Sequence, residues 1–383
     1  MRFLHISDLH IGKVVNDFSM LEEQRLILDQ LVSLAAENKV DALVIAGDIY
    51  DRAIPPGEAV SLFDQFLTKL SDQGIQIIMI SGNHDSPERI SFGEHLLCAR
   101  GVHIAGVWNR QTKRVLLGDT EFVLLPFFKP VREEEADSSS AVARALERYW
   151  QQEAETQGAS RKEQGQKQRV LITHFFVTDQ GKEPALSESE TTIHVGGLDN
   201  VEASLFEGFD YVALGHIHRC QQIGERPVWY SGSTLKYSFG ECGQEKCALL
   251  VNLEEHRAEV TRLLLHPARE FRKIKGSLEE LLRQGQADER RSDYLQAVLT
   301  DRGELIDPMG TLRSVYPNMM QILRAGEWER EQRAEQRADR MLAGRKDPVA
   351  LFEAFYQEVT EETLSEEEKE RITDIIRELE DCL

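Results

Sequence analysis

Five short segments of the sequence carry side chains that can bind divalent metal ions, and each segment follows an apolar run. These side chains belong to Asp8, His10, Asp48, Asn83, His84, His174, His216 and His218. Two divalent ions roughly 3.5–4 Å apart need a bridging carboxylate, with oxygen and imidazole ligands completing each coordination sphere. A mixed set of oxygen and nitrogen ligands suits manganese, iron or zinc better than magnesium. The residue types therefore indicate a two-metal hydrolase.

The spacing within the segments supports this interpretation. Alternate residues of an extended segment share a face, so Asp8 with His10, and His216 with His218, can each approach one centre. Asp48 is the natural bridging ligand, because one carboxylate can use both oxygens and the preceding glycine allows a close approach. A single histidine at a strand end is more often a structural hydrogen bonder. Five such segments together favour the metal site.

The apolar runs predict the strands that must position these side chains. Strands are expected at residues 2–7, 41–46, 75–80, 102–105, 121–125, 169–173 and 210–214. Helices are expected at about 20–38, 57–71 and 91–97. Strands that alternate with helices predict an α/β fold with a largely parallel sheet, and ligands of such sheets lie beyond the carboxyl ends of the strands.

A chain of 383 residues exceeds one comfortable core, so a large domain with smaller additions is expected. We assign residues 1–266 to the large domain, with 132–168 as a solvated surface insertion. Alternating segments from about 221 to 265 are expected to complete a second sheet as antiparallel strands. The predicted additions are a small α+β capping domain at 267–326, a charged linker at 327–347 and a helical tail at 348–383.

The charge balance restricts the functions that the chain can have alone. A net charge of −21, from 66 acidic and 45 basic residues, argues against a free-standing nucleic-acid binder, which normally carries a basic face. It does not exclude a nuclease whose metals and partner supply positive charge. The sequence predicts no signal peptide and no membrane-spanning segment, and five scattered cysteines fit reduced thiols. A cytoplasmic protein is therefore expected.

An apolar stripe in the helical tail predicts a surface that docks onto a partner, although such a stripe could also be ordinary core. Its residues are Leu351, Phe352, Phe355, Tyr356, Val359, Ile372, Ile375, Ile376 and Leu379. Ser365, with Glu368 three residues later, suits a capping box that opens the second helix of the tail.

The five segments resemble the five sequence blocks of the calcineurin-like metallophosphoesterase superfamily. The blocks here are Asp8-x-His10, Gly47-Asp48-x-x-Asp51-Arg52, Gly82-Asn83-His84-Asp85, His174 and Gly215-His216-x-His218. Within the superfamily, the residues around the first three blocks are similar to the SbcD family of bacterial nuclease subunits. Gly232-Ser233-Thr234 and Ser238-Phe239-Gly240-Glu241 are similar to the late core segment of that family.

This resemblance implies a four-layer αββα core with two manganese ions, for which Mg²⁺, Fe²⁺ or Zn²⁺ could substitute. One ion would be bound by Asp8, His10, Asp48 and His218, and the other by Asp48, Asn83, His174 and His216. His84 would not be a ligand but would lie beside the scissile phosphate and assist the leaving oxygen. Asp85 is a candidate to orient His84 for catalysis, although it could merely cap a turn.

The resemblance also implies a function. It implies an SbcD-like subunit of an SbcCD-type complex, a DNA nuclease with 3′–5′ exonuclease and endonuclease activity. Such a subunit processes double-strand ends and hairpins in DNA repair, replication and recombination. Its partners would be DNA, an SbcC-type ATPase and a second copy of the chain, as a homodimer within a heterotetramer associated with the nucleoid.

Two other functions compete with this one. A calcineurin-like phosphodiesterase or phosphatase could use the same five blocks on small phosphoesters. It would not need the small additional domain or the amphipathic tail, so these parts favour the nuclease. A metal-stabilised scaffold without activity predicts that some ligand position is substituted, and every position is occupied by a ligand residue here.

Overall fold

The computed structural model describes residues 1–130, 137–159, 167–186 and 200–326, together with 328, 352, 356, 364–365, 368–369 and 371–373. The chain forms two compact units. The first comprises Met1–Lys273, Glu289–Gln296 and Tyr316–Met320. The second comprises Ile274–Asp288, Ala297–Val315 and Gln321–Leu383.

The first of two large sheets has the strand order β16-β15-β1-β4-β5-β6. Its four parallel strands are β1 (Arg2–Ile6), β4 (Ala42–Ala46), β5 (Gln76–Ile80) and β6 (Val102–Ala105). The hairpin of β15 (Cys247–Glu254) and β16 (Arg257–Leu264) pairs with β1 in the antiparallel sense. The expectation that this hairpin completes the second sheet is therefore wrong, since alternation identifies a strand but not its neighbour.

The second large sheet has the order β13-β14-β12-β9-β8-β7. The parallel strands are β14 (Val228–Tyr230), β12 (Tyr211–Leu214), β9 (Gln168–Thr173) and β8 (Thr120–Leu125). The antiparallel edge strands are β13 (Gln221–Gln222) and β7 (Lys113–Leu117). Two further strand pairs are small: β2 (Val14–Val15) with β3 (Phe18–Ser19), and β10 (Phe176–Thr178) with β11 (Asn200–Glu202).

The two large sheets pack face to face, and their central strands are apolar on both sides. Successive residues of a strand point to opposite faces, so each strand contributes to two cores. In β4, Val44 joins the core between the sheets with Ile172 and Tyr211 of the other sheet. Its neighbours Leu43 and Ile45 join the outer core. This explains why the strands are continuous apolar runs.

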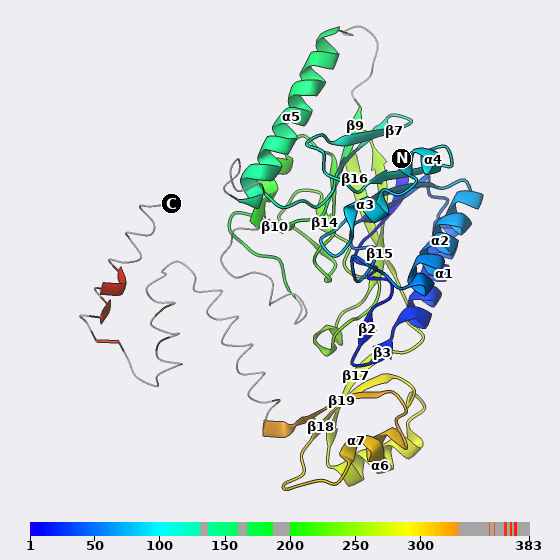
Figure 1. Ribbon diagram of the computed structural model, residues 1–383, viewed down its shortest axis with the longest axis vertical. Coiled ribbons are helices and arrows are strands. Elements are labelled where there is room, and N and C mark those ends of the chain that lie inside the picture. The colour runs from blue at the N-terminus through cyan, green and yellow to red at the C-terminus, as the bar shows by residue number, and fades with distance from the viewer. Residues whose placement is uncertain are drawn as a thin grey trace. The chain divides into compact units, whose positions relative to one another are not determined.

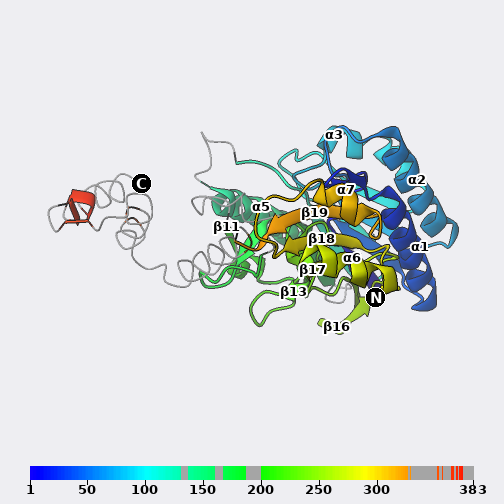
Figure 2. The ribbon, with the colours of Figure 1, turned by 90° about the horizontal axis from the view of Figure 1, so that it is seen from below.

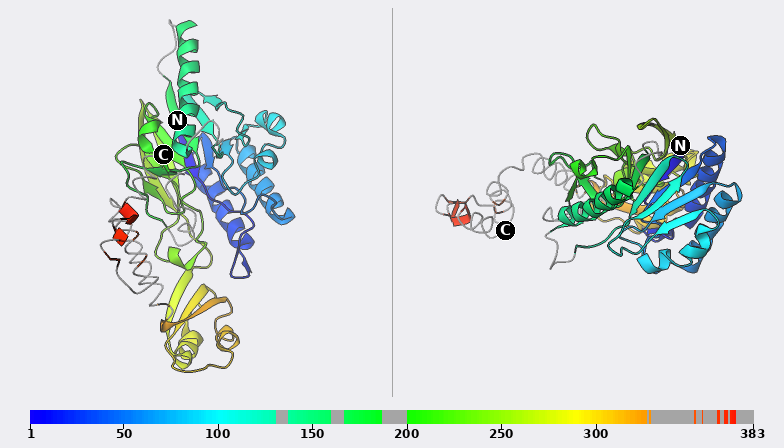
Figure 3. Two further views of the ribbon diagram at one scale, coloured as in Figure 1. Left: turned by 60° about the vertical axis from the view of Figure 1, so that its left-hand side comes forward. Right: turned by 90° about the horizontal axis from the view of Figure 1, so that it is seen from above.

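Helices cover the outer face of each sheet. On the first sheet, α1 (Leu21–Glu37) and α2 (Gly57–Asp72) pack against β4 and β5, and the short helices α3 (Pro87–Ile90) and α4 (Glu94–Cys98) follow β5. On the second sheet lies α5 (Ser138–Ala159), with the short η1 (Ala203–Phe206). Figure 1 and the right-hand view of Figure 3 show α1 and α2 on one side of the strands and α5 on the other. The predicted four-layer α/β fold is confirmed.

Helix α5 differs from the solvated insertion that we expected at 132–168. One of its faces is buried against the second sheet, through Ala141, Val142, Ala145, Leu146 and Tyr149. These residues recur at helical spacing, but they are small or separated by charged residues in the sequence. The outward-facing Gln and Glu residues dominate the composition and obscured this apolar stripe.

After β16 in the chain, β17 (Phe271–Gly276), β18 (Tyr294–Leu299) and β19 (Met319–Arg324) form a three-stranded sheet. Helices α6 (Leu278–Ala287) and α7 (Pro308–Arg313) lie next to each other beside it (Figure 2). Helix α6 begins with a capping box between Ser277 and Glu280, which satisfies two N–H groups of its first turn.

Only part of the C-terminal segment is described. Ser365 donates its N–H to the Glu368 carboxylate over 2.9 Å, and Glu368 donates its N–H to the Ser365 hydroxyl, so the predicted capping box is present. Phe352, Tyr356 and Ile372 are half-buried. The remaining residues of the predicted docking stripe lie outside the described residues: Leu351, Phe355, Val359, Ile375, Ile376 and Leu379. In the described part of the chain, no helix is both long and apolar enough to cross a membrane.

Candidate metal centre

The residues predicted to bind metal follow the carboxyl ends of five strands. Strand β1 leads to Asp8 and His10, β4 to Asp48, and β5 to Asn83. The strands β9 and β12 of the second sheet lead to His174 and to the His216–His218 segment. Backbone hydrogen bonds join neighbouring turns: Asp8 donates its N–H to the Gly47 carbonyl over 3.1 Å, and His10 donates to the Asp48 carbonyl over 3.0 Å. Both sheets therefore contribute side chains to one place.

The backbone is strained at four of these positions. Asp8, His10, Asp48 and His216 have φ angles of 52°, 45°, 51° and 105°. Residues with a Cβ rarely adopt this left-handed region, at a cost of about 1–3 kcal/mol each, and such residues cluster at functional sites. The four residues lie in the turns whose side chains converge.

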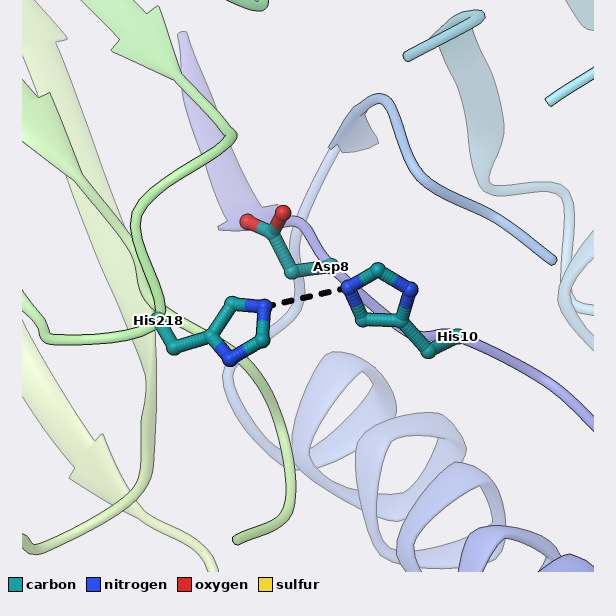
Figure 4. A group of neighbouring side chains, drawn as sticks. All are labelled: Asp8, His10 and His218. Carbon is teal, nitrogen blue, oxygen red and sulfur yellow. Dashed lines mark hydrogen bonds between the residues drawn. The ribbon is translucent and has the colours of Figure 1, made fainter. Parts of the chain in front are cut away.

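One group of side chains consists of Asp8, His10 and His218 (Figure 4). Nε2 of His10 lies 3.1 Å from Nε2 of His218, and both rings are buried. Two imidazole nitrogens at this distance can share a proton or bind a cation between them. Nδ1 of His10 is buried and has no hydrogen-bond partner among the described residues. The Asp8 carboxylate accepts hydrogen bonds from the Ser7 hydroxyl and, over 3.1 Å, from the His216 N–H.

A second group forms around Asn83. Its side-chain oxygen lies 3.0 Å from Nε2 of His174 and 3.0 Å from Nδ1 of His216. Asp48 lies between the two groups, since its Oδ2 is 3.3 Å from Nε2 of His174 and 3.8 Å from Nε2 of His10. The structure thus brings together all seven residues that the sequence marks as ligands, with Asp48 where a bridging carboxylate would be needed.

The close approach of the turns depends on two glycines. A Cβ at Gly82 would lie 2.1 Å from Oδ1 of Asp48, and one at Gly215 would lie 2.0 Å from the Ala46 carbonyl oxygen. No side chain fits at these distances, so only glycine permits the contact. The residues present fit divalent cations, because oxygen and nitrogen acceptors converge there in buried positions with few donors to satisfy them.

The electrostatics of the site reflect the same convergence. Burial raises the pKa of the Asp8 carboxyl to about 6, against the opposing effect of His174 and His218. Burial also acts to raise the pKa of Asp48, but the adjacent His174 outweighs it and holds that pKa well below its usual range. Burial would lower the pKa of His174, but the Asp48 carboxylate raises it to about 9. A proton on His174 therefore compensates negative charge that a bound cation would compensate instead.

His84 lies at the edge of the group and is half-buried. Its backbone N–H donates to Oδ1 of Asp48 over 2.9 Å, and its ring packs edge-on against His10. Nδ1 of His84 lies 3.0 Å from the Asp51 carbonyl oxygen. Because a carbonyl can only accept, Nδ1 carries the proton of this bond, and Nε2 is the ring nitrogen that can exchange a proton with a substrate.

Of the two roles considered for Asp85, the geometry favours the turn cap over the orientation of His84. Its Oδ2 accepts from the N–H groups of Gly82 and Ile49 over 2.9 and 3.1 Å, and its Oδ1 accepts from Tyr50 over 2.9 Å. The carboxylate therefore joins the turn after β5 to the turn after β4. The group that faces Nδ1 of His84 is the backbone of Asp51, which sequence patterns could not identify.

A buried glutamine, which the sequence patterns do not mark, also supports the site. Gln24, on α1, donates its side-chain N–H groups to the carbonyls of His10 and Leu9 over 2.7 and 3.3 Å. Its side-chain oxygen accepts from the Gly12 N–H over 3.0 Å. These bonds fix the turn that carries Asp8 and His10. A glutamine on the apolar face of α1 was the only sequence signal for this role.

Two family models match separate parts of the chain. Residues 1–220 match the model described as calcineurin-like phosphoesterase. Residues 267–360 match SbcD_C, described as type 5 capsule protein repressor C-terminal domain.

Three of the solved structures that resemble this chain come from Thermus thermophilus, Danio rerio and Streptococcus pneumoniae. A Thermus thermophilus protein is 14% identical, with a TM-score of 0.40 over 68% of this chain and 98% of that one. A dimetal phosphatase from Danio rerio is 12% identical, with a TM-score of 0.38 over 70% of this chain and 99% of that one. A predicted phosphoesterase from Streptococcus pneumoniae is 15% identical, with a TM-score of 0.30 over 70% of this chain and 93% of that one.

Proposed function

Since the chain belongs to the calcineurin-like phosphoesterase family, with an SbcD-type C-terminal domain, we propose that it is a metal-dependent DNA nuclease, the SbcD-like subunit of an SbcCD-type complex. The observation that carries the proposal is the pairing of a complete set of ligand residues in the phosphoesterase domain with that C-terminal domain. A phosphatase acting on small phosphoesters needs the first but not the second. The proposed substrates are double-strand ends and hairpins, cut in DNA repair, replication and recombination.

We propose that two Mn²⁺ ions bind at the site, with Mg²⁺, Fe²⁺ or Zn²⁺ as substitutes. Asp8, His10, Asp48 and His218 would hold one ion, and Asp48, Asn83, His174 and His216 would hold the other. The mixture of imidazole, carboxylate and amide ligands supports manganese over magnesium. Bound divalent cations supply Lewis-acid polarisation of a phosphoryl oxygen and offset the negative charge that develops during phosphodiester hydrolysis.

His84 is the proposed catalytic residue. It stands beside the ligand cluster and is half-exposed, so a phosphodiester bound at the cluster can reach it. Nδ1 of His84 donates a hydrogen bond to the Asp51 carbonyl, which fixes the orientation of the ring. A protonated ring can then donate from Nε2 to the oxygen that leaves when the phosphodiester bond breaks.

The proposed partners follow from surface chemistry. A chain with a net charge of −21 needs a partner that supplies positive charge to hold DNA, and an SbcC-type ATPase is proposed for this role. The C-terminal stripe that includes Phe352, Tyr356 and Ile372 is the proposed docking surface. A second copy of the chain is also proposed, because Phe92 and Leu96 expose 85% and 81% of their surface near α3 and α4. Such a complex would act on the nucleoid in the cytoplasm.

The test is manganese-dependent cleavage of linear and hairpin DNA by the purified chain, with and without the ATPase and ATP. The variant His84→Asn should lower the cleavage rate by roughly 10²–10⁴-fold while the protein retains its manganese, as measured by elemental analysis. The matched control is His256→Asn, in the turn between β15 and β16 at the opposite end of the first sheet, which should cut DNA at the normal rate.

The outcome also separates the two candidate activities. If DNA stays intact under every condition while a simple phosphodiester such as bis(p-nitrophenyl) phosphate is hydrolysed, the small-phosphoester enzyme becomes the better account. If His84→Asn loses manganese together with activity, its proposed role beside the ligands is wrong.

A further inference from the structure

The segment from Gly232 to Lys246 surrounds the turn that carries His218, yet the proposed reaction does not use it. A Cβ at Gly232 would lie 2.7 Å from the His218 carbonyl oxygen, so the two turns are in direct contact. Ser233 donates its N–H to that carbonyl over 3.1 Å. Glu241 ends the short helix η2 (Phe239–Glu241), and Lys246 immediately precedes β15. Glu241 and Lys246 are both charged and both buried.

The Lys246 ammonium lies within hydrogen-bond distance of four acceptors from this region, of which the weakest is the Gln244 side-chain oxygen at 3.1 Å. It donates to Oε2 of Glu241 over 2.6 Å, to the His218 carbonyl over 2.9 Å and to the Ser233 hydroxyl over 2.9 Å. Glu241 has no exposed surface, and Lys246 has 6%. A buried ion pair contributes little net stability compared with apolar residues of the same size, so such a pair suggests a role other than stability.

The carboxylate of Glu241 also faces the ring of His218. Its Oε1 lies 3.7 Å from Nδ1 of His218, which is longer than a hydrogen bond but close enough for a strong electrostatic effect. The same oxygen accepts from the Ser238 hydroxyl over 3.1 Å, which fixes the carboxylate in place. On the other side of the ring, Nε2 of His218 faces Nε2 of His10, as Figure 4 shows. The carboxylate thus lies behind the ring and the ligand cluster lies in front of it.

We propose that Glu241 is a positioning residue, which keeps the proton of His218 on Nδ1 and leaves the lone pair of Nε2 for the metal. Lys246 keeps Glu241 in place and, through the His218 carbonyl, fixes the backbone of the same residue. This inference rests on the proposed two-metal site and assigns a role to the Glu241 segment. Carboxylates that contact a metal-binding histidine in this way orient the ring and raise its basicity, and their removal weakens metal binding by roughly 10–100-fold.

The test is titration of the metal-free protein with Mn²⁺ by calorimetry, which does not depend on nuclease activity. In Glu241→Gln, one of the two ions should bind roughly 10–100-fold more weakly, while the affinity for the other stays within a few-fold. The matched control is Glu121→Gln. Glu121, in β8 of the second sheet, is also a buried glutamate, 4% exposed, but it accepts a hydrogen bond from Tyr149 of α5. This control should bind both ions normally.

A double variant separates positioning from folding. Glu241→Gln with Lys246→Met removes both charges, so thermal unfolding in a chelator should recover toward the wild-type temperature. The affinity for the weakened ion should not recover. If the double variant regains both stability and manganese affinity, the pair is merely structural and the proposal is overturned.

A measurement on the wild-type chain tests the proposal without a variant at Glu241. In ¹⁵N-histidine spectra of the metal-free protein, the signal that disappears in His218→Asn should show the tautomer protonated at Nδ1. A proton on Nε2 would overturn the proposal.

The manganese titration has three further outcomes. If Glu241→Gln binds both ions like the wild type, the proposed positioning role of Glu241 is wrong. If the wild type binds two ions but cuts no DNA, the nuclease proposal fails and the positioning role stands. If the wild type binds no manganese, both fail.

Discussion

At the scale of single residues, His5 shows how a buried side chain makes stability depend on pH. It lies between the two sheets, where Nδ1 is 3.0 Å from the Tyr211 hydroxyl and Nε2 is 3.2 Å from the Leu214 carbonyl oxygen. Burial lowers the pKa of His5 from its usual 6.5 to about 3, against the opposing effect of the Leu214 carbonyl. Between pH 6.5 and about pH 3, the folded chain therefore keeps His5 neutral while the unfolded chain binds a proton there.

The sign of the pH effect follows directly. Above pH 6.5 both states have a neutral His5, and its contribution is constant; as the pH falls below 6.5, stability is lost at up to about 1.4 kcal/mol per pH unit. Urea unfolding in a chelator at pH 7, 6 and 5 should therefore give a free energy of unfolding that depends less steeply on pH in His5→Gln than in the wild type. The difference in slope should correspond to the uptake of one proton on unfolding. Equal slopes in the two proteins would contradict a neutral buried His5.

Asp85 is predicted to matter for folding more than for catalysis. In Asp85→Ala, three buried N–H groups lose their acceptor, so the free energy of unfolding should fall by about 3 kcal/mol or more. Guanidinium unfolding of the metal-free protein measures this loss. A variant with unchanged stability and bound manganese but a lower cleavage rate would restore the catalytic role that the sequence suggested.

At the scale of elements, α5 is part of the fold and not an appendage. Leu146 is 3% exposed and packs in the core of the second sheet. Leu146→Ala should therefore lower the free energy of unfolding by about 2–5 kcal/mol, as large-to-small core substitutions do. The neighbouring Glu147 points to solvent, and Glu147→Ala is the matched control, with an expected change within about 0.5 kcal/mol. Equal, small effects in both variants would mean that the helix is a solvated insertion after all.

The elements also show which parts of the fold the sequence could predict. The strands that end at Asp8, Asp48 and Asn83 were predictable, because each is an apolar run that stops abruptly at polar residues. The partners of a strand were less predictable: nothing local shows that residues 247–254 pair with β1 rather than with the second sheet. The same limit applies to Asp85, whose acceptor role involves Ile49 and Tyr50, more than 30 residues away.

The residues of the site divide in the same way. Asp8, His10 and His218 were found because their side chains have metal-binding chemistry and recur after strands. Gln24 and Lys246 were not, because they act through backbone carbonyls that any residue provides. Residues that hold ligands in place leave little trace in sequence patterns, whereas the ligands themselves do.

At the scale of the whole molecule, bound metal should stabilise the fold. The ligands come from both large sheets, and the unfolded chain has no preformed site, so binding favours the folded state. Each Mn²⁺ ion present at ~100 times its dissociation constant should add about 2.7 kcal/mol, which raises the unfolding temperature by several degrees. Differential scanning fluorimetry with manganese or with chelator measures this shift.

His84→Asn provides the internal check on that shift. Because His84 is proposed to be outside the ligand set, manganese should raise the unfolding temperature of this variant as much as that of the wild type. In His216→Asn, manganese should raise the unfolding temperature less. If manganese leaves the unfolding temperature of the wild-type chain unchanged, the cluster does not bind it under these conditions.

The antiparallel pairing of β1 with β15 has a consequence for how the chain is made. Arg2 lies opposite Asn252, so a central strand of the first sheet pairs with a strand that is synthesised 250 residues later. At ribosomal rates of about 5–20 residues per second, that interval is roughly 10–50 s. During this time one edge of β1 on the nascent chain has no partner from β15. Strand edges of this kind attract other chains, so protection by a chaperone would be of most use before residue 254 emerges from the ribosome.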